Sequence, residues 1–415
     1  MNRVFKKLMS ASLSTGIRTG RLEVRWPDGT VSVYGDGGAP QAGLEIKDAA
    51  MLRRMAVNPS LALGEGYMEQ RIVPLDCSIY DLLHVIMLNV NRHWNEISVL
   101  RWSTRLRQIV RPISQANTVR KARRNVAHHY DLNGRLYSLF LDRDRQYSCA
   151  YFHRGDETLE EAQSAKKKHI AAKLKLDRPG LSVLDIGCGW GGMALTLARE
   201  YGAQVMGVTL SEEQLREARA RAAAEGLDHR VRFELMDYRK VAQAFDRIVS
   251  VGMFEHVGVP NYGEFFRVIK RSLKPDGVAL LHSIGRFEGP SVTNPWITKY
   301  IFPGGYSPAL SEVLGPVENA GLITTDIEIL RLHYAKTLAH WRFRFAANRD
   351  MISTLYDERF CRMFEFYLAA SELSFRVGDH MNFQLQLTRD LNVLPICRDY
   401  MAEAERETML AESGN

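Results

Sequence analysis

The sequence lacks any apolar segment long enough to cross a membrane, because nowhere do about 18 uncharged apolar residues follow one another. Its first residues include several cations but no apolar core of the kind that marks a secretion signal. Cysteine is scarce as well: the five cysteines lie far apart, with no CxxC pair and no spacing to histidine that suits a metal. We therefore expect a cytoplasmic protein that neither crosses the membrane nor carries a secretion signal, and that holds no metal ion.

Acidic residues are missing from one long interval, although the chain of 415 residues contains 48 of them. Between Ile97 and Tyr130 there is no Asp or Glu, whereas eight cations occur there. Such an interval attracts polyanions, and it suits a solvated linker, a surface for anionic lipid headgroups or a nucleic-acid contact. Charge alone does not decide between these three. The eight cations are Arg101, Arg105, Arg107, Arg111, Arg120, Lys121, Arg123 and Arg124.

The length and a hydrophobic content of 46% suit two globular domains. In the N-terminal part, two short β-rich runs, Leu22–Trp26 and Thr30–Tyr34, flank a Pro-Asp-Gly turn and predict a hairpin. Apolar residues at helical spacing predict a helix over 78–100 that leads into the basic interval. We therefore predict a small α+β domain over residues 1–112 and a basic linker over residues 113–124.

Beyond residue 125, strands alternate with helices, a rhythm that predicts a doubly wound, mainly parallel α/β sheet of the Rossmann-like kind. We assign residues 125–400 to this second domain and expect the polar, helix-prone tail 401–415 to fray. The predicted helices include 212–225 and 262–273. The predicted strands are 182–186, 203–208, 231–235, 247–251 and 278–284.

A glycine-rich turn follows the first of these strands, in the sequence LDIGCGWGG. Glycine lets the backbone turn sharply and approach a ligand closely. The spacing also satisfies the dinucleotide pattern GxGxxG, so a dinucleotide or a purely structural turn remains open. Asp185 favours S-adenosylmethionine (SAM), because a carboxylate there attracts an ammonium group and repels a pyrophosphate. The predicted cofactor contacts in this turn are Asp185, Gly187, Gly189 and Gly191.

The ends of the next two strands supply the predicted nucleoside contacts. The second strand ends without the acidic residue that often binds ribose hydroxyls, so Thr209 and Gln214 would take that role. Alternatively, Ser211 and Gln214 only cap the following helix. After the third strand, Asp237 would accept a hydrogen bond from the adenine amino group and Tyr238 would stack on the ring. The alternative for Asp237 is an exposed turn carboxylate.

Several motifs of the second domain occur together in one known family. The chain resembles the cyclopropane fatty acid synthase family, including the mycolic acid cyclopropane synthases, over nearly all of residues 125–400. The N-terminal domain is similar to that of the longer, phospholipid-acting bacterial members and is absent from the mycobacterial enzymes. The motifs that carry the resemblance are the glycine turn, His129–Leu132, Gln146–Phe152, Phe245–Gly258, Leu281–Gly285, Lys299–Gly305 and His333–Leu338.

The resemblance implies a class I SAM-dependent methyltransferase that acts on cis double bonds of unsaturated acyl chains in membrane phospholipids and closes a cyclopropane ring. It also implies a bicarbonate ion beside the transferable methyl group, and contacts from Tyr147 and Ser148 to the methionine end of SAM. The chain departs from many relatives at Ser371, where they have cysteine, so no cysteine nucleophile is expected there. The implied bicarbonate ligands are Cys149, Glu255, His282, Tyr334 and the backbone of Ile284.

Methyl transfer to an isolated alkene creates carbocation character, so the site has to be dry and lined by groups that tolerate a cation. Four aromatic residues are candidates for such a wall, although core packing explains any single one at least as well. We interpret His256 as structural. The aromatic candidates are Phe152, Phe254, Tyr300 and Phe302.

Three alternative functions remain open: a related methyltransferase that gives methyl-branched or methylene lipids, an RNA methyltransferase, and a lipid-binding protein without enzymatic activity. No NPPY base-binding motif and no RNA-binding module occurs, so we expect no nucleic-acid partner. We expect a homodimer that associates peripherally with the inner face of the cytoplasmic membrane. A shallow amphipathic helix would assist this contact, formed by Val4, Phe5, Leu8 and Met9 beside Lys6 and Lys7.

Overall fold

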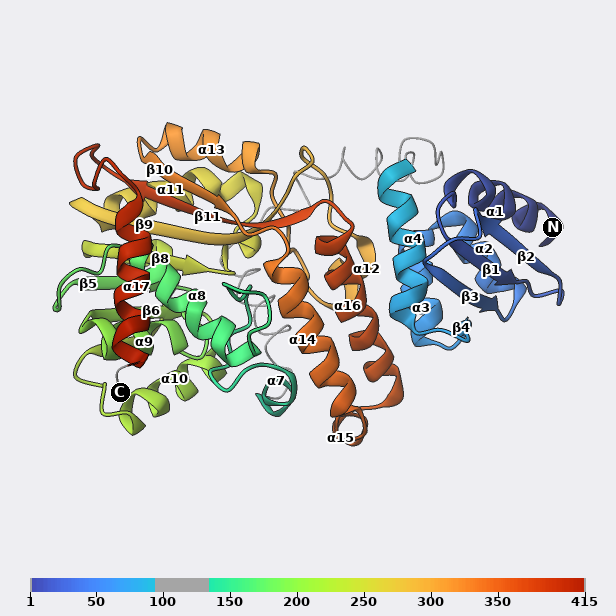
Figure 1. The fold of residues 1–415 in the computed structure, drawn as a ribbon, viewed down its shortest axis with the longest axis horizontal. Helices are drawn as coiled ribbons and strands as arrows, with labels where there is room; N and C mark the ends of the chain where they lie inside the picture. Colours follow the sequence, from blue (N-terminus) through green and yellow to red (C-terminus); the bar gives the residue numbers. More distant parts are fainter. Residues whose placement is uncertain (1, 94–133, 414–415) are drawn as a thin grey trace. The chain divides into compact units, whose positions relative to one another are not determined.

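The structure, a computed structural model, describes residues 2–93 and 134–413 (Figure 1). The predicted basic linker over 113–124, the eight cations and the boundary near residue 112 all lie outside the described residues. The contacts divide the chain into two compact units.

The first unit comprises the described N-terminal residues together with Ser291–Pro303 and Ala335–His380, and the second comprises the other described residues. The sequence pattern predicts that these two later segments belong to the second domain, whereas the contacts group them with the N-terminal part. The domain boundaries along the sequence stay a prediction.

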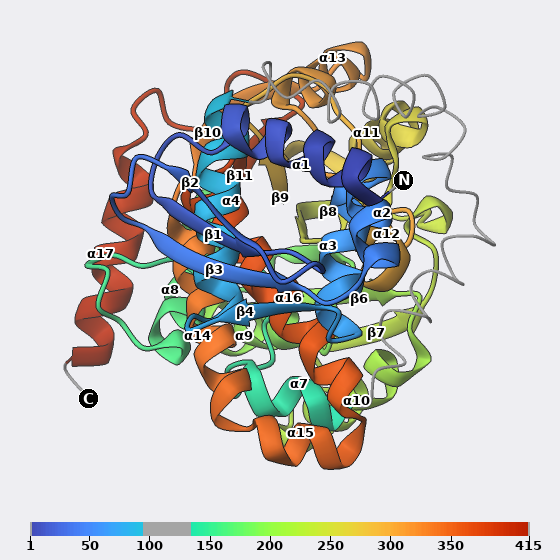
Figure 2. The ribbon, with the colours of Figure 1, turned by 90° about the vertical axis from the view of Figure 1, so that its right-hand side faces the viewer.

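A four-stranded sheet organises the N-terminal part of the first unit, in the order β2-β1-β3-β4. β1 pairs antiparallel with β2, with Leu22 opposite Tyr34, as the predicted hairpin requires, and it pairs parallel with β3. Helix α1 (Asn2–Gly16) contacts β2 and α2 (Figure 2). The strands span Arg21–Arg25 (β1), Val31–Gly35 (β2), Gln41–Ile46 (β3) and Ile72–Leu75 (β4).

Helices from distant parts of the chain pack together in this unit. The buried indole of Trp296 lies 4.6 Å from the ring of Phe366, measured between centroids. Glu65 accepts hydrogen bonds from Lys299 Nζ at 2.6 Å and from the Tyr300 hydroxyl at 2.8 Å. The helices are α2 (Ala49–Val57), α3 (Pro59–Met68), α4 (Ile79–His93), α12 (Pro295–Tyr300), α15 (Arg349–Leu355), α16 (Glu358–Arg376) and most of α14 (His333–Ala347).

A seven-stranded sheet organises the second unit, in the order β10-β11-β9-β8-β5-β6-β7. β5 pairs in parallel with both β6 and β8, so the chain winds outward in two directions from this central strand, and the predicted Rossmann-like α/β class is confirmed. The antiparallel pair β10 and β11 was not predicted. The strands span Ser182–Ile186 (β5), Gln204–Thr209 (β6), Val231–Leu235 (β7), Phe245–Val251 (β8), Leu273–Arg286 (β9), Ile323–Ile329 (β10) and His380–Thr388 (β11).

Helices cover both faces of this sheet, because neighbouring residues of a buried strand point to opposite sides. In β5, Val183 packs with α8, α9 and α10 in one apolar core, whereas Leu184 packs with α11 and α13 in another. Helices α8 and α17 lie side by side (Figure 1). The helices span Gly134–Phe140 (α7), Leu159–Lys173 (α8), Gly192–Tyr201 (α9), Glu212–Ala224 (α10), Tyr262–Ser272 (α11), Leu310–Asn319 (α13) and Asp399–Ser413 (α17).

The described part of the C-terminal tail is helical: α17 begins at Asp399 and packs on α8, and fraying of the tail stays a prediction. Met401 is buried, and the ring of His169 of α8 joins two carboxylates. Its Nδ1 is hydrogen-bonded to Glu405 of α17, and its Nε2 lies 2.6 Å from Glu328 Oε2 of β10. These hydrogen bonds have no signature along the sequence, because the three residues are far apart in the chain.

We expect Glu405→Gln to lower the free energy of unfolding by about 1–3 kcal/mol near pH 6 and by less near pH 9. Burial by itself lowers the pKa of His169, but the hydrogen bonds to Glu328 and Glu405 outweigh it and raise the pKa. The stability from a raised histidine pKa is complete below the unfolded pKa and is lost as pH rises through the folded one. Urea unfolding at the two pH values measures it.

The control is Glu403→Gln, which removes an exposed charge from the same helix. An equal loss of stability for the two variants, or a loss for Glu405→Gln that does not shrink at high pH, would contradict the proposed role of His169.

Candidate active site

A cavity of about 160 Å³ opens in the second unit at the carboxyl ends of β5, β6, β7 and β8. Ligands of open α/β sheets bind at this edge, where the strand order reverses. Nine of the ten residues predicted to bind the cofactor line it. They are Tyr147, Ser148, Asp185, Gly187, Gly189, Thr209, Gln214, Asp237 and Tyr238.

The glycine turn has the backbone conformation that its sequence predicts. Gly187 has a φ of +83°, and a Cβ there would lie 2.8 Å from the side chain of Met253 across the cavity wall. Gly191, the tenth predicted residue, does not line the cavity. It adopts a φ of +85° at the start of α9, and a Cβ there would lie 2.7 Å from the ring of Phe233. Glycine is therefore needed at position 191 because the ring of Phe233 occupies the space that a side chain would fill.

Asp185 lies at the end of β5 with only 2% of its surface exposed. Its Oδ2 is buried and has no hydrogen-bond partner among the residues that the structure describes. Burial raises the pKa of Asp185 to about 7, and the positive charge of Lys166 acts in the opposite direction. A buried carboxylate oxygen without a partner is costly, so this atom fits a cationic ligand group.

The residues predicted to bind the nucleoside also make hydrogen bonds within the protein. Ser211 caps α10 by accepting a hydrogen bond from the Gln214 N–H, and the Thr209 hydroxyl donates to Gln214 Oε1 at 3.1 Å. Asp237 is buried rather than exposed, and Arg239 donates to both of its carboxylate oxygens, at 2.9 and 2.7 Å.

A second group of polar residues adjoins the cavity. Glu255 follows β8 in a single 3-10 turn (Phe254–His256), and its Oε1 accepts a hydrogen bond from the Ile284 N–H of β9 at 2.7 Å. Its Oε2 is buried and unpartnered within the described part of the chain. Burial raises the pKa of Glu255 to about 7, and the Ile284 hydrogen bond opposes the shift.

His282 of β9 is 1% exposed and presents a second unpartnered atom. Its Nδ1 lies 3.2 Å from the side-chain amide nitrogen of Gln384 of β11, whereas no described residue bonds its Nε2. Burial lowers the pKa of His282 to about 3, so the ring is neutral at physiological pH. If Gln384 donates to Nδ1, the ring proton sits on Nε2 and is available to a ligand.

The other two predicted bicarbonate ligands, Cys149 and Tyr334, are also buried. The Cys149 thiol donates to the carbonyl of Ala150 at 3.3 Å. Their two segments meet nearby, because the Phe152 N–H donates to His333 Nδ1 at 2.9 Å. None of the five predicted ligands lines the cavity itself, although Cys149 follows Ser148 and Glu255 precedes His256 there.

The structural role of His256 and the aromatic wall both stay predictions. His256 lines the cavity, and burial lowers its pKa to about 4, so it is neutral there. Phe254 packs in the apolar core, 4.2 Å from the ring of Tyr262. The sequence offered no signal for other lining residues beyond their position after a strand; they include Trp190, Met193, Met236, Arg239 and Met253.

Across residues 2–93 and 134–413, no helix combines the length and the apolar character that a membrane span requires. In the same part of the chain, no group of His, Cys, Asp and Glu side chains is arranged to hold a metal ion.

The chain is similar to known cyclopropane synthases. Residues 117–385 match the family model described as mycolic acid cyclopropane synthetase, and residues 4–97 match a domain family of unknown function. The chain is 40% identical over 364 residues to a cyclopropane-fatty-acyl-phospholipid synthase of Escherichia coli, a match that covers 88% of this chain and 92% of the relative. It is 35% identical over 384 residues to a tuberculostearic acid methyltransferase of Mycobacterium tuberculosis, covering 89% and 88% of the two chains.

Solved structures of cyclopropane synthases are also similar to about two thirds of the chain. A cyclopropane synthase from Mycobacterium tuberculosis superposes with a TM-score of 0.61 at 34% identity, covering 64% of this chain and 97% of that one. A mycolic acid cyclopropane synthase complexed with SAH and CTAB superposes with a TM-score of 0.60 at 35% identity, with the same coverage of 64% and 97%.

Proposed function

The chain belongs to the mycolic acid cyclopropane synthetase family, and we propose that it methylates the cis double bond of unsaturated acyl chains in membrane phospholipids and closes a cyclopropane ring. The observation that carries the proposal is a pair of buried polar atoms, Glu255 Oε2 and His282 Nε2, that lack partners among the described residues. They adjoin a cavity whose wall includes Asp185, where a third such atom lies.

The cavity residues fit SAM as the methyl donor. Asp185 Oδ2 would accept hydrogen bonds from the ammonium of the methionine moiety, and Thr209 and Gln214 would bind the ribose. Because Arg239 engages both carboxylate oxygens of Asp237, the adenine amino group would use a remaining lone pair. When bound, SAM supplies a methyl group to one alkene carbon while sulfur keeps the bonding pair, and loss of a proton from that methyl lets the C–H pair close the ring.

The residues around Glu255 suit the proton loss. Water would trap a cation as an alcohol, and both Glu255 and His282 are shielded from it. A bare Glu255 carboxylate is unsuited as the direct base, because it could be methylated by the sulfonium or form an ester with the cation. A small bound base that can leave with its proton avoids both side reactions.

We therefore propose that bicarbonate binds between Glu255 and His282. The neutral ring of His282 would donate from Nε2, and Glu255, with a pKa of about 7, can donate in its acid form or accept in its ionised form. Cys149 and Tyr334 remain proposed ligands on the strength of the family resemblance. The Ile284 N–H already donates to Glu255, so Ile284 would have to share that hydrogen bond with the ion.

The substrate class is tested by following label from methyl-labelled SAM. We expect label in unsaturated phospholipid and none in saturated phospholipid or in RNA. Label in RNA alone would overturn the proposal.

A methyl-branched product is the second candidate, because a relative of nearly equal coverage is named a tuberculostearic acid methyltransferase. Such an enzyme would add the same methyl group, but the resulting cation would not lose a proton from that methyl group and would not close a ring. Proton NMR of the lipid product separates the two, since ring protons and branch methyl protons have different chemical shifts.

We also propose that the protein is a homodimer, from the family resemblance, and that it associates peripherally with the membrane. The exposed side chains of Val4 and Leu8 on α1, 66% and 45% accessible, support the membrane contact. Lys6 of the same helix is held by Asp28, so the cations of the basic interval would supply most of the attraction to anionic lipid.

We expect the variant with Arg120, Lys121, Arg123 and Arg124 all changed to Gln to sediment far less with anionic vesicles at low salt than the wild type does. Each cation near an anionic membrane contributes up to about 1 kcal/mol. The difference should shrink with salt, because the Debye length falls from about 10 Å at 0.1 M to about 3 Å at 1 M.

The matched control removes the same amount of charge from exposed arginines of the second unit by changing each to Gln. Equal binding of the wild type and the test variant, or an equal loss in the control, would return the basic interval to the interpretation of a solvated linker. The control positions are Arg154, Arg178, Arg232 and Arg398, whose side chains are 71%, 58%, 78% and 64% exposed.

A further inference from the structure

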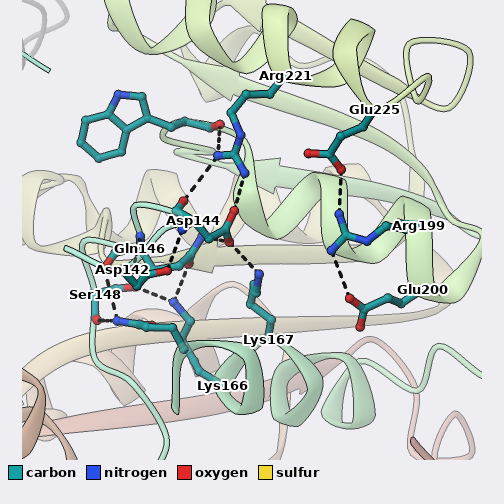
Figure 3. A network of polar contacts seen from close by, with 12 residues as sticks. Asp142, Asp144, Gln146, Ser148, Lys166, Lys167, Arg199, Glu200, Arg221 and Glu225 are labelled. Carbon is teal, nitrogen blue, oxygen red and sulfur yellow. Dashed lines mark hydrogen bonds and ion pairs between the residues drawn. The ribbon is translucent and has the colours of Figure 1, made fainter. Parts of the chain in front are cut away.

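Helix α8 carries a lysine that is fully buried next to the cavity wall. The ammonium of Lys166 donates hydrogen bonds to Gln146 Oε1 at 2.6 Å and to Ser148 Oγ at 2.8 Å (Figure 3). Both acceptors are neutral side chains of residues that line the cavity. No carboxylate among the described residues forms an ion pair with Lys166. A buried ammonium without such a partner is costly, so its retention calls for a compensating role.

Two other residues of α8, one a turn earlier and one directly after Lys166, hold the same loop without an unpaired charge. Gln163 donates to the carbonyl of Ser148 at 2.9 Å, and Lys167 pairs with Asp144 at 2.6 Å. The spacing of three and four residues places all of these side chains on one face of the helix. Figure 3 shows Lys166 and Lys167 reaching the loop side by side, with Lys167 alone directed at a carboxylate.

Asp185 is a buried group of the opposite charge, and its Oδ2 has no hydrogen-bond partner in the described chain. Burial lowers the pKa of Lys166 to about 8 and raises that of Asp185 to about 7. The charge of Lys166 acts on Asp185 against the effect of burial. The two groups are linked to the same cavity, since Lys166 donates to Ser148, and Ser148 and Asp185 both line the cavity.

We propose that Lys166 is a positioning residue of the cofactor site, whose ammonium fixes Ser148 in the cavity wall and stabilises the negative charge of Asp185 that receives the ammonium of SAM. This inference rests on the proposed function. It assigns to α8, which contributes no residue to the cavity surface, a share of the affinity for SAM and of its dependence on pH.

Several other titratable groups lie near Lys166 and Asp185. Asp144 is held ionised by Lys167 and Arg221, which keep its pKa below the usual range despite burial. Burial raises the pKa of Asp142, whose carboxylate accepts from the backbone N–H groups of Gln146 and Asp144, and the positive charge of Lys166 acts against this rise as it does at Asp185. The Cys188 thiol adds no charge at neutral pH, because burial raises its pKa well above its ordinary value.

The test is the affinity for SAM as a function of pH, measured by calorimetry on the full chain carrying Lys166→Gln or Lys166→Met. Glutamine keeps donors for Gln146 and Ser148 but no charge, whereas methionine keeps only the volume. In both variants we expect the midpoint of the pH dependence to move upward by about one unit, because Asp185 loses its stabilising cation. Affinity at neutral pH should fall by about five- to tenfold. Circular dichroism establishes that each variant is folded, and the glutamine variant suffices if the methionine variant is not.

The matched control is Lys167→Gln, which removes the same charge from the adjacent residue but uncouples Asp144 instead of Asp185. Its midpoint should stay at the wild-type value. A wild-type midpoint in the Lys166 variants, even with weaker binding at every pH, would overturn the electrostatic assignment, and so would an equal shift in the control. Failure of the wild type to bind SAM at all would instead sink the proposed function.

Discussion

Replacement of Asp185 by alanine is expected to abolish measurable binding of SAM. The change removes the buried carboxylate whose Oδ2 has no partner among the described residues, and with it the charge-assisted hydrogen bond to the ligand ammonium. Loss of such a bond costs roughly 1.5–3 kcal/mol or more, which corresponds to about 10- to 100-fold or more in affinity. Calorimetric titration of the folded variant with SAM is the measurement.

Asp185→Asn serves as the companion variant, because it keeps the shape and removes the charge. The affinity of the wild type should fall as pH drops through about 7, the raised pKa of Asp185, since the protonated acid no longer attracts the ligand ammonium. The asparagine variant should bind weakly and lose this pH dependence. Wild-type affinity in the alanine variant would remove Asp185 from the cofactor site.

Replacement of Glu255 by glutamine is expected to cut turnover by roughly 100-fold or more, the range typical of a residue that takes part in general acid–base chemistry. Affinity for SAM should stay close to that of the wild type, because Glu255 does not line the cavity. Turnover of labelled SAM with unsaturated phospholipid and calorimetric affinity are compared on the same preparation.

The same substitution should stabilise the fold at alkaline pH. Burial raises the pKa of Glu255 to about 7. The contribution of Glu255 to the stability of the wild type is therefore complete below its unfolded pKa and is lost as pH rises through its folded pKa. Glutamine carries no such penalty. Loss of SAM binding in Glu255→Gln would place Glu255 in the cofactor site instead, and unchanged turnover would remove it from the chemistry.

Much of the fold could be predicted because the central strands are short apolar runs between helical stretches. The residues predicted for the first and third strands of the second domain coincide with β5 and β7. Strands β10 and β11 escaped prediction for a physical reason. β10 is only partly buried, and β11 buries Asn382, Gln384 and Gln386 between its apolar residues, so neither has the simple apolar pattern of a core strand.

Site residues that belong to a sequence motif could be predicted. Site residues that depend on contacts between distant parts of the chain could not. The glycine turn identified Asp185 and its cavity, and the family resemblance pointed to Glu255 and His282. The roles of Gln384 and Lys166 depend on contacts between residues about 100 and 20 positions apart, at 3.2 and 2.6 Å. Such contacts have no signature along a single sequence.

The most direct test of the account uses SAM with a fully deuterated methyl group and an unsaturated phospholipid. The account predicts a lipid heavier by one methylene that keeps two of the three deuterium atoms and shows cyclopropane ring signals in its proton NMR spectrum, because one deuteron leaves the new methyl group when the ring closes. Retention of all three deuterium atoms in a branch methyl group, or the absence of label from the lipid, would contradict it.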